Sequence, residues 1–327
     1  MTDKTGREAC DEGLQPFVDK FAEKPFVFKD ESAIRRHRSD MNKTDTVESV
    51  QEGYHKYVDG RHKLIHKVHE VNSGNVSPFK LSIFTPDKPA PTGGRPCLYF
   101  IHGGGLVTNN AFSGIHSIFH CIDTLNAVCV SIDYSLAPDL KAPTQVKQCY
   151  EGLEEIWNKY NNSNEINFDK LAVIGRSAGA TLLVGLNIKM RGHPHIKIRC
   201  NIMSFPMLDN GCDTQSHQDF CDAPHLPSRT VILCWSHYLR GGEVSGLTVP
   251  ALSTIEELQD FPPIFIEKGN ADVLSVEAEN FQRKLSSAGV DAPIRHYAGF
   301  HCFDGTSTDI ARRIKQDRLE FLRNQME

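Results

Sequence analysis

The residues best placed for chemistry are a serine between two glycines, in the run Gly175-Arg176-Ser177-Ala178-Gly179. The apolar run LAVI precedes it and the helix-forming run ATLLVGLNIKM follows. A strand–turn–helix setting of this kind pushes a serine Oγ out of a sheet as a nucleophile. Flanking glycines allow a turn that a Cβ would obstruct. At average residue usage such a motif arises by chance in roughly one chain in ten of this length, so it needs support.

A second motif, His102-Gly103-Gly104-Gly105, follows the apolar run CLYFI and supplies that support. Successive glycines let backbone N–H groups approach a substrate oxygen, and such a run arises by chance in well under about 1% of chains. We expect the amides of Gly103, Gly104 and Ala178 to form an oxyanion hole. Gly105 and Leu106 are expected to contact substrate.

A serine nucleophile needs a histidine base, which a carboxylate orients. In this arrangement the chain order is serine, acid, histidine, so both partners should follow Ser177. His301 comes just after the last predicted strand, in the run AGFHCF, and is the predicted base. His296, inside that strand, is the main alternative.

The predicted acid is Asp272, in the run GNADVL directly after the predicted strand IFIEKG. The carboxyl ends of parallel strands form the functional edge of an open sheet. Asp260, Glu277 and Asp304 remain alternatives, and Asp272 also suits the N-cap of the next helix.

Two groups of histidines do not indicate a metal site. His116 and His120 lack the intervening glutamate of a zinc protease. His62, His66 and His69 lie along a strand pattern in which side chains alternate between faces. The ten cysteines show no zinc spacing, and the glycines at 103–105 lack the ending of a phosphate loop. We therefore predict neither a metal nor a cofactor.

Strand and helix patterns alternate along most of the chain. This alternation predicts an α/β fold with a mostly parallel central sheet and helices on both faces. LIHKVHEV and FKLSIFTP are predicted to form a hairpin. The later predicted strands are CLYFIH, AVCVSIDY, LAVIG, RCNIMSF, PPIFIEKG and PIRHYAG, and the later helices cover 145–160, 276–288 and 307–325.

Two regions interrupt the alternation. Residues 12–24 and 46–58 have helical spacing, and residues 205–255 are rich in Pro, Gly, Cys and Asp without a clear core strand. We expect residues 1–60 to supply cap helices. Residues 61–327 are expected to form the catalytic domain, with a cap insertion at about 205–255.

Composition excludes several classes of protein. The 327 residues carry a formal net charge of -5, without the basic surface of a nucleic-acid binder. The run Arg35-Arg36-His37-Arg38 is interpreted as a solvent-exposed face. No signal sequence or membrane-spanning run is evident, so the expected location is cytoplasmic, with reduced thiols. Self-association is left open.

The motifs together resemble the hormone-sensitive-lipase-like carboxylesterases, also called family IV or the α/β-hydrolase fold-3 group, over roughly residues 80–325. Asp133-Tyr134-Ser135-Leu136-Ala137-Pro138 is similar to the family's Asp-Tyr-Arg-Leu-Ala-Pro, and Trp235 with His237-Tyr238-Leu239 is similar to a stretch of its cap. Three positions depart from the family pattern. Arg176 stands where the family has an acid, Ala180 where it has glycine, and Ser135 where it has arginine.

This resemblance implies an α/β-hydrolase fold, a triad of Ser177, Asp272 and His301, and a cap that lines the acyl pocket. The expected activity is hydrolysis of carboxylic esters of small or medium acyl groups through an acyl-enzyme. The alternatives are a lyase, cyclase or deacetylase that acts on a natural-product intermediate, and a non-catalytic small-molecule receptor.

Overall fold

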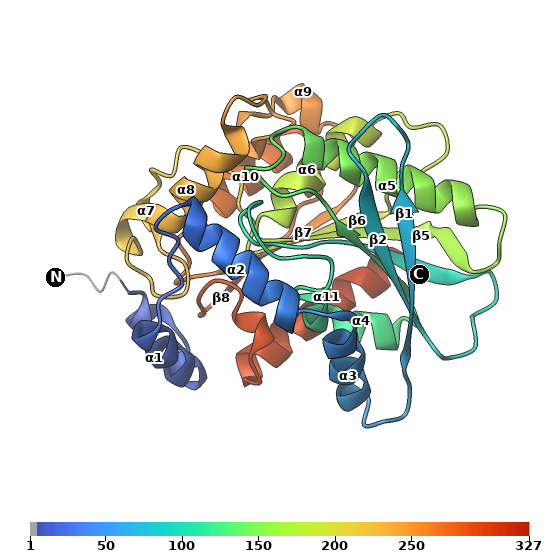
Figure 1. Cartoon of the computed structure of the whole chain (residues 1–327), viewed down its shortest axis with the longest axis horizontal. Helices are drawn as coiled ribbons and strands as arrows, with labels where there is room; N and C mark the ends of the chain where they lie inside the picture. The colour runs from blue at the N-terminus through green and yellow to red at the C-terminus, as the bar shows by residue number, and fades with distance from the viewer. Residues whose placement is uncertain (1–4, 327) are drawn as a thin grey trace.

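A twisted sheet runs through the middle of the molecule in the computed structural model, which describes residues 5–326 (Figure 1). In that part of the chain the sheet has eight strands, in the order β1-β2-β4-β3-β5-β6-β7-β8. The strands are β1 Leu64–Val71, β2 Phe79–Pro86, β3 Arg95–Ile101, β4 Val128–Asp133, β5 Ile166–Arg176, β6 Cys200–Ser204, β7 Ile264–Gly269 and β8 Ile294–Tyr297. β2 is antiparallel to β1 and β4, and the other neighbours are parallel.

Burial explains why the strands differ in sequence. All residues of β3, β6 and β7 are buried, because helices cover both faces of the central strands. β1 lies at a lateral edge of the sheet, so only its two end residues, Leu64 and Val71, are buried. The predicted hairpin of β1 and β2 and the predicted α/β fold class are both confirmed.

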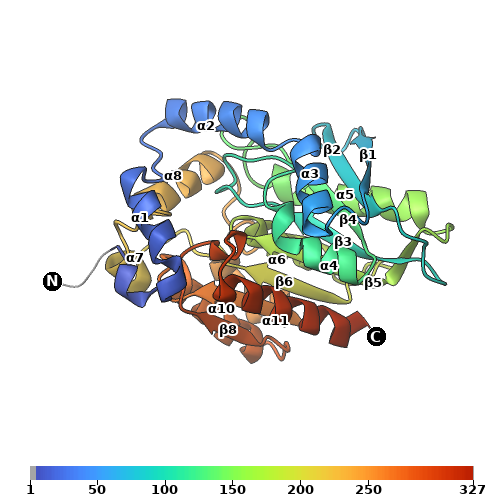
Figure 2. The same ribbon diagram turned by 90° about the horizontal axis from the view of Figure 1, so that it is seen from below.

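Helices divide between the two faces of the sheet. α5, α6 and α10 pack on one face, and α3, α4 and α11 on the other (Figures 1 and 2). Their bounds are α3 Val47–Tyr57, α4 Phe119–Thr124, α5 Thr144–Tyr160, α6 Gly179–Met190, α10 Ser275–Ser287 and α11 Asp309–Met326. The helix α9, Ile255–Leu258, is a single turn.

Four further helices gather at one end of the sheet in both views (Figures 1 and 2). They are α1 Gln15–Glu23, α2 Glu31–Thr44, α7 Gln215–Asp219 and α8 Ser228–Leu239. α1 lies within the helix predicted over 12–24. α2 was not predicted, because it buries only Ile34 and so has little apolar periodicity.

Two expectations about the first 60 residues need correction, and residues 1–4, like residue 327, lie outside the described part. α3 does not join the other N-terminal helices, because Tyr54 packs on the ring of Phe119 beside the sheet, with ring centroids 5.6 Å apart. The basic run on α2 is not wholly solvent-exposed. The Arg38 side chain is only 13% exposed and pairs with Asp139 at 2.5 Å.

Candidate active site

Ser177 occupies a tight turn between β5 and α6. Its φ of 51° lies in the left-handed region, which is unfavourable for a residue with a side chain. Its N–H donates to the carbonyl of Ser204 at 2.8 Å, which fixes the turn against β6. A Cβ on Gly179 would lie 2.1 Å from the carbonyl oxygen of Ile101, so only glycine lets α6 begin so close to β3.

The structure brings His301 between Ser177 and Asp272. His301 Nε2 lies 2.9 Å from Ser177 Oγ, and Nδ1 lies 2.8 Å from Asp272 Oδ2. The other oxygen of Asp272 accepts the N–H of Leu274 at 3.0 Å. One carboxylate therefore shapes its own turn and faces the imidazole at the same time.

Burial and charge oppose each other at His301. Burial lowers the pKa of the imidazole, but the Asp272 carboxylate and the Cys302 thiol together raise it more, so the net shift is upward. Nearby His225 has no such pairing, and burial lowers its pKa to about 4. His225 is therefore neutral at pH 7.

The alternative acids and base lie elsewhere. His296 is 48% exposed and lies 3.7 Å from Glu279. Glu277 accepts the N–H of Leu208, and Asp304 binds Arg176. Asp260 lines a different hollow, which is described below.

The amides of Gly103, Gly104 and Ala178 meet no acceptor within residues 5–326. Gly103 lies against the serine turn, where a Cβ would be 2.9 Å from Ser177 Cβ and from the carbonyl oxygen of Arg176. Backbone N–H groups without an acceptor, close to a serine hydroxyl, are available to bind an oxyanion.

His102, the first residue of the glycine motif, is fully buried rather than open to the cavity. Its ring stacks on Tyr134 with centroids 4.1 Å apart, and the Tyr134 hydroxyl donates to the His102 carbonyl at 2.9 Å. Burial lowers the pKa of His102 to about 4. Its contacts fix the glycine loop, and Tyr134 comes from the Asp-Tyr-Ser segment that the sequence singled out.

A cavity of about 390 Å³ opens above Ser177 and His301. Gly105 lines it, as predicted, whereas Leu106 is fully buried in the core and lies outside the lining, so its predicted substrate contact is corrected. The apolar part of the lining comes mainly from α2, α8 and the segments before them: Phe26, Phe28, Met41, Leu226, Val231 and Cys234.

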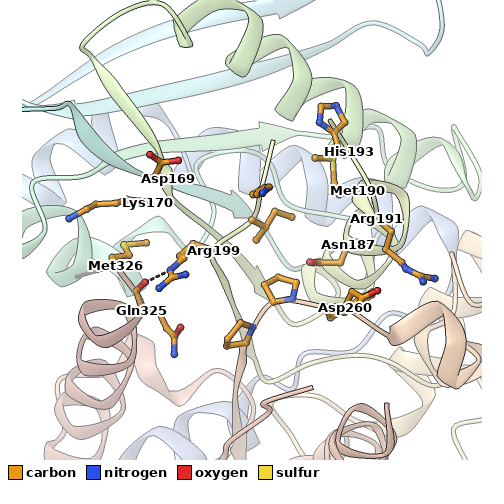
Figure 3. A pocket seen from close by; sticks show the side chains of 16 residues that line it. Asp169, Lys170, Asn187, Met190, Arg191, His193, Arg199, Asp260, Gln325 and Met326 are labelled. Atoms are coloured by element: carbon orange, nitrogen blue, oxygen red, sulfur yellow. Dashed lines mark hydrogen bonds between the residues drawn. The ribbon is translucent and has the colours of Figure 1, made fainter. Parts of the chain in front are cut away.

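A larger hollow, of about 1120 Å³, is shown in Figure 3. It lies at the amino ends of the parallel strands, whereas Ser177 and His301 follow their carboxyl ends. Residues that precede β6 and β7 line it, together with the ends of α6 and α11: Arg199, Asp260, Met190 and Met326 are among them. Neither Ser177 nor His301 reaches this hollow, so size alone does not mark the reactive site.

Within residues 5–326 no group of three or more His, Cys, Asp or Glu side chains is arranged to hold a metal ion. In the same residues no helix is long and apolar enough to cross a bilayer.

Comparison with known proteins adds independent evidence. Residues 98–304 match a protein-family model described as alpha/beta hydrolase fold. Vegetative-specific protein H5 of Dictyostelium discoideum is 30% identical over 239 residues, which are 69% of this chain and 70% of that protein. Carboxylic ester hydrolase LipN of Mycobacterium tuberculosis is 27% identical over 230 residues, 64% of this chain and 57% of that protein. The structure of esterase LipW from Mycobacterium marinum superposes with a TM-score of 0.85 at 22% identity, over 99% of this chain and 98% of that one.

Proposed function

Because the chain belongs to the α/β-hydrolase fold family, in its hormone-sensitive-lipase-like branch, we propose that it is a serine hydrolase that cleaves carboxylic esters. The carrying observation is the unbroken contact from Ser177 through His301 to Asp272, at 2.9 and 2.8 Å. The name of the mycobacterial relative, carboxylic ester hydrolase, supports the same reaction.

The proposed reaction has two halves. His301 accepts the Ser177 proton at Nε2 while Oγ bonds to the ester carbonyl carbon, and the amides of Gly103, Gly104 and Ala178 stabilise the oxyanion. The bond to the alcohol oxygen then breaks, and His301 returns the proton to the alcohol. Water, deprotonated by His301, attacks the acyl-enzyme, and Ser177 leaves with its proton restored.

We place the acyl group in the cavity beneath α2 and α8, which we propose act as a cap together with α1 and α7. A volume of about 390 Å³ is at the small end for ligand pockets and favours small or medium acyl groups over long ones. Its apolar side chains suit an aliphatic or aromatic acyl chain.

The test is to measure hydrolysis of p-nitrophenyl acetate, butyrate, octanoate and laurate by the wild type and by Ser177→Ala. We expect Ser177→Ala to lower kcat by at least about 10³-fold. Ser236→Ala removes an exposed hydroxyl on α8 and is the matched control. A wild type that reacts with a fluorophosphonate but releases no acid from any ester would point to a lyase, and one that does neither would point to a receptor.

A further inference from the structure

Arg176 stands immediately before Ser177, where the resembling family has an acid, and its side chain reaches the loop that carries His301. Its Nη1 lies 2.6 and 2.8 Å from the two carboxylate oxygens of Asp304. Its Nη2 donates to the carbonyl of Cys302 at 3.3 Å. One guanidinium therefore binds the residue directly after His301 and the third residue after it.

The other side of this contact is also held by charge. Asp304 accepts from Arg318 Nη2 at 3.0 Å, and Arg318 in turn pairs with Glu267 at 2.7 Å. All four side chains are buried, and their two positive and two negative charges cancel. Burial alone would raise the pKa of Asp304, but the charges of Arg176 and Arg318 outweigh it and lower the pKa to about 2. Asp304 is therefore ionised at neutral pH.

The same network reaches the serine turn. The Ser204 hydroxyl donates to Glu267, and the Ser204 carbonyl accepts the N–H of Ser177. The ring of Phe205 lies 5.9 Å from Arg176 Cζ and 5.8 Å from the His301 ring centroid. The buried charge network and the Phe205 ring thus connect the Ser177 turn with His301.

We propose that Arg176 is a positioning residue that ties the His301 loop to the Ser177 turn. The inference rests on the proposed function, in which Ser177 and His301 are nucleophile and base. Arg176 borders the cavity, but its charge is already paired with the Asp304 carboxylate at Nη1, and its Nη2 donates to the Cys302 carbonyl. Its role is therefore in holding the base rather than in binding a substrate anion.

The charges around His301 affect its pKa, and a change in that pKa distinguishes the proposed role of Arg176 from a simple loss of packing. Asp272 and the Cys302 thiol act on the imidazole directly. His225, Arg176 and Asp304 lie on the elements around it, with Lys315 and His116 beyond Asp304. Removing only Arg176 leaves an excess negative charge near His301. Removing only the Asp304 charge leaves an excess positive one. The pKa of the base should then rise in the first variant and fall in the second.

The experiment compares Arg176→Met, Arg176→Lys, Asp304→Asn and the double variant Arg176→Met/Asp304→Asn. Fluorophosphonate titration counts the active sites, so kcat is expressed per folded site. We expect Arg176→Met to lower kcat about 10²-fold with little change in KM, as for a misplaced catalytic group. Arg176→Lys, which keeps the charge, should recover part of that loss.

The acidic limb of kcat/KM should move to higher pH in Arg176→Met, to lower pH in Asp304→Asn, and back toward the wild type in the double variant. Arg312→Met, which breaks an exposed pair with Asp309 on α11, is the control and should change neither kcat nor the limb.

The proposal would be overturned if Arg176→Met had the wild-type kcat per titrated site. It would also be overturned if the acidic limb of the pH profile of kcat/KM moved in the same direction in Arg176→Met and Asp304→Asn. A raised KM at unchanged kcat confined to esters that bear a carboxylate would overturn it as well, and would make Arg176 a substrate-binding residue. Failure of the proposed function is recognised separately, because Ser177→Ala would then be as active as the wild type.

Discussion

At the scale of single residues, the Asp272 carboxylate faces the imidazole and shapes its own turn, and these two roles can be separated. Asp272→Asn keeps an oxygen that can accept from Leu274 but removes the charge beside His301. We expect kcat/KM to fall by about 10⁴-fold, because the base loses its orienting partner. An unchanged rate would reduce Asp272 to a turn residue.

The same variant has a predicted pH dependence. The base must be neutral to accept the Ser177 proton, so kcat/KM falls as pH drops through the pKa of His301. Asp272 holds that pKa above its ordinary value of 6.5. In Asp272→Asn the acidic limb should therefore move to lower pH, which a profile of residual kcat/KM between pH 5 and 10 measures. A limb that stays in place would contradict the assignment.

Gly103 offers a second test at this scale. A Cβ there would lie 2.9 Å from Ser177 Cβ, so Gly103→Ala must push the glycine loop away from the serine turn. The predicted result is a kcat loss of about 10²–10³-fold, as when an oxyanion donor is removed. Gly53→Ala on α3, whose Cβ would meet only the Phe119 ring at 3.3 Å, should retain wild-type kcat. Equal activity of the two variants would argue against an oxyanion role for this loop.

Ser177, Asp272 and His301 could be predicted from the sequence, because each directly follows a predicted strand and the three occur in the order serine, acid, histidine. The Arg176–Asp304 pair joins residues that are 128 positions apart, so no local sequence pattern predicts it. His225 belongs to the inserted region 205–255, where no strand pattern indicates its position. Only the fold shows that it lies at the cavity wall, next to Phe300.

At the scale of elements, backbone bonds hold the acid and base loops together. Asn270 N–H donates to the Tyr297 carbonyl at 2.8 Å, and Ala271 N–H donates to Gly299 at 3.0 Å. α1 covers this pair of loops, since its Val18 shares an apolar cluster with Phe300 and its Phe21 ring lies 5.6 Å from the Phe300 ring. The N-terminal helix thus contributes to the surroundings of the base.

α2 depends on one largely covered arginine for much of its attachment. Arg38 donates to the carbonyls of Val107 and Ala137 and pairs with Asp139. We predict that Arg38→Met lowers the free energy of unfolding by about 1–3 kcal/mol, because two buried carbonyls lose their donor. Urea unfolding measures this loss. Arg36→Met, on the exposed face of the same helix, should change stability by less than about 0.5 kcal/mol. Equal losses in both variants would show that helix propensity, not attachment, is responsible.

Apolar burial explains part of how well an element could be predicted from sequence, although α8 buries Val231, Trp235 and Tyr238 and is not predicted. The predicted segments LIHKVHEV and FKLSIFTP have the bounds of β1 and β2, and the helix predicted over 145–160 corresponds to α5 at Thr144–Tyr160. The sequence pattern does not predict α2 or the short α7, because polar contacts, rather than an apolar stripe, attach these two helices. For the same reason Arg38 was assigned to solvent.

For the molecule as a whole, the two edges of the sheet are distinguished by the side chains they hold and not by which has the larger hollow. The amino edge holds the larger hollow, where Arg191 follows the last residue of α6 and Arg199 donates to the Gln325 carbonyl at the end of α11, so that both basic side chains offset a helix dipole. The carboxyl edge holds the smaller cavity, but the loops after β5, β7 and β8 bring Ser177, Asp272 and His301 together there. Parallel strands therefore place the proposed chemistry at one edge only.

Whole-molecule stability should depend on pH through Glu277, which joins α10 to the inserted region. Its Oε1 accepts the N–H of Leu208, and its Oε2 lies 3.9 Å from His217 Nε2 of α7. Burial raises the pKa of Glu277 to about 7, although His217 partly offsets that effect. Because the folded-state pKa is raised, the protonated form stabilises the fold below pH 4.5, and this contribution is lost as pH rises through about 7.

Glu277→Gln keeps an acceptor for Leu208 and cannot ionise, so it isolates this effect. Its stability relative to the wild type should increase by roughly 2 to 3 kcal/mol between pH 5 and pH 8, since one unit of pKa corresponds to about 1.36 kcal/mol. Urea unfolding at several pH values measures the difference, and all other titrating groups are common to both proteins. Glu256→Gln, at an exposed position on α9, should show no such trend. A difference that stays constant with pH would mean that Glu277 does not change its protonation state in the fold over this range, and burial would then not control the charge of the contact between α10 and the inserted region.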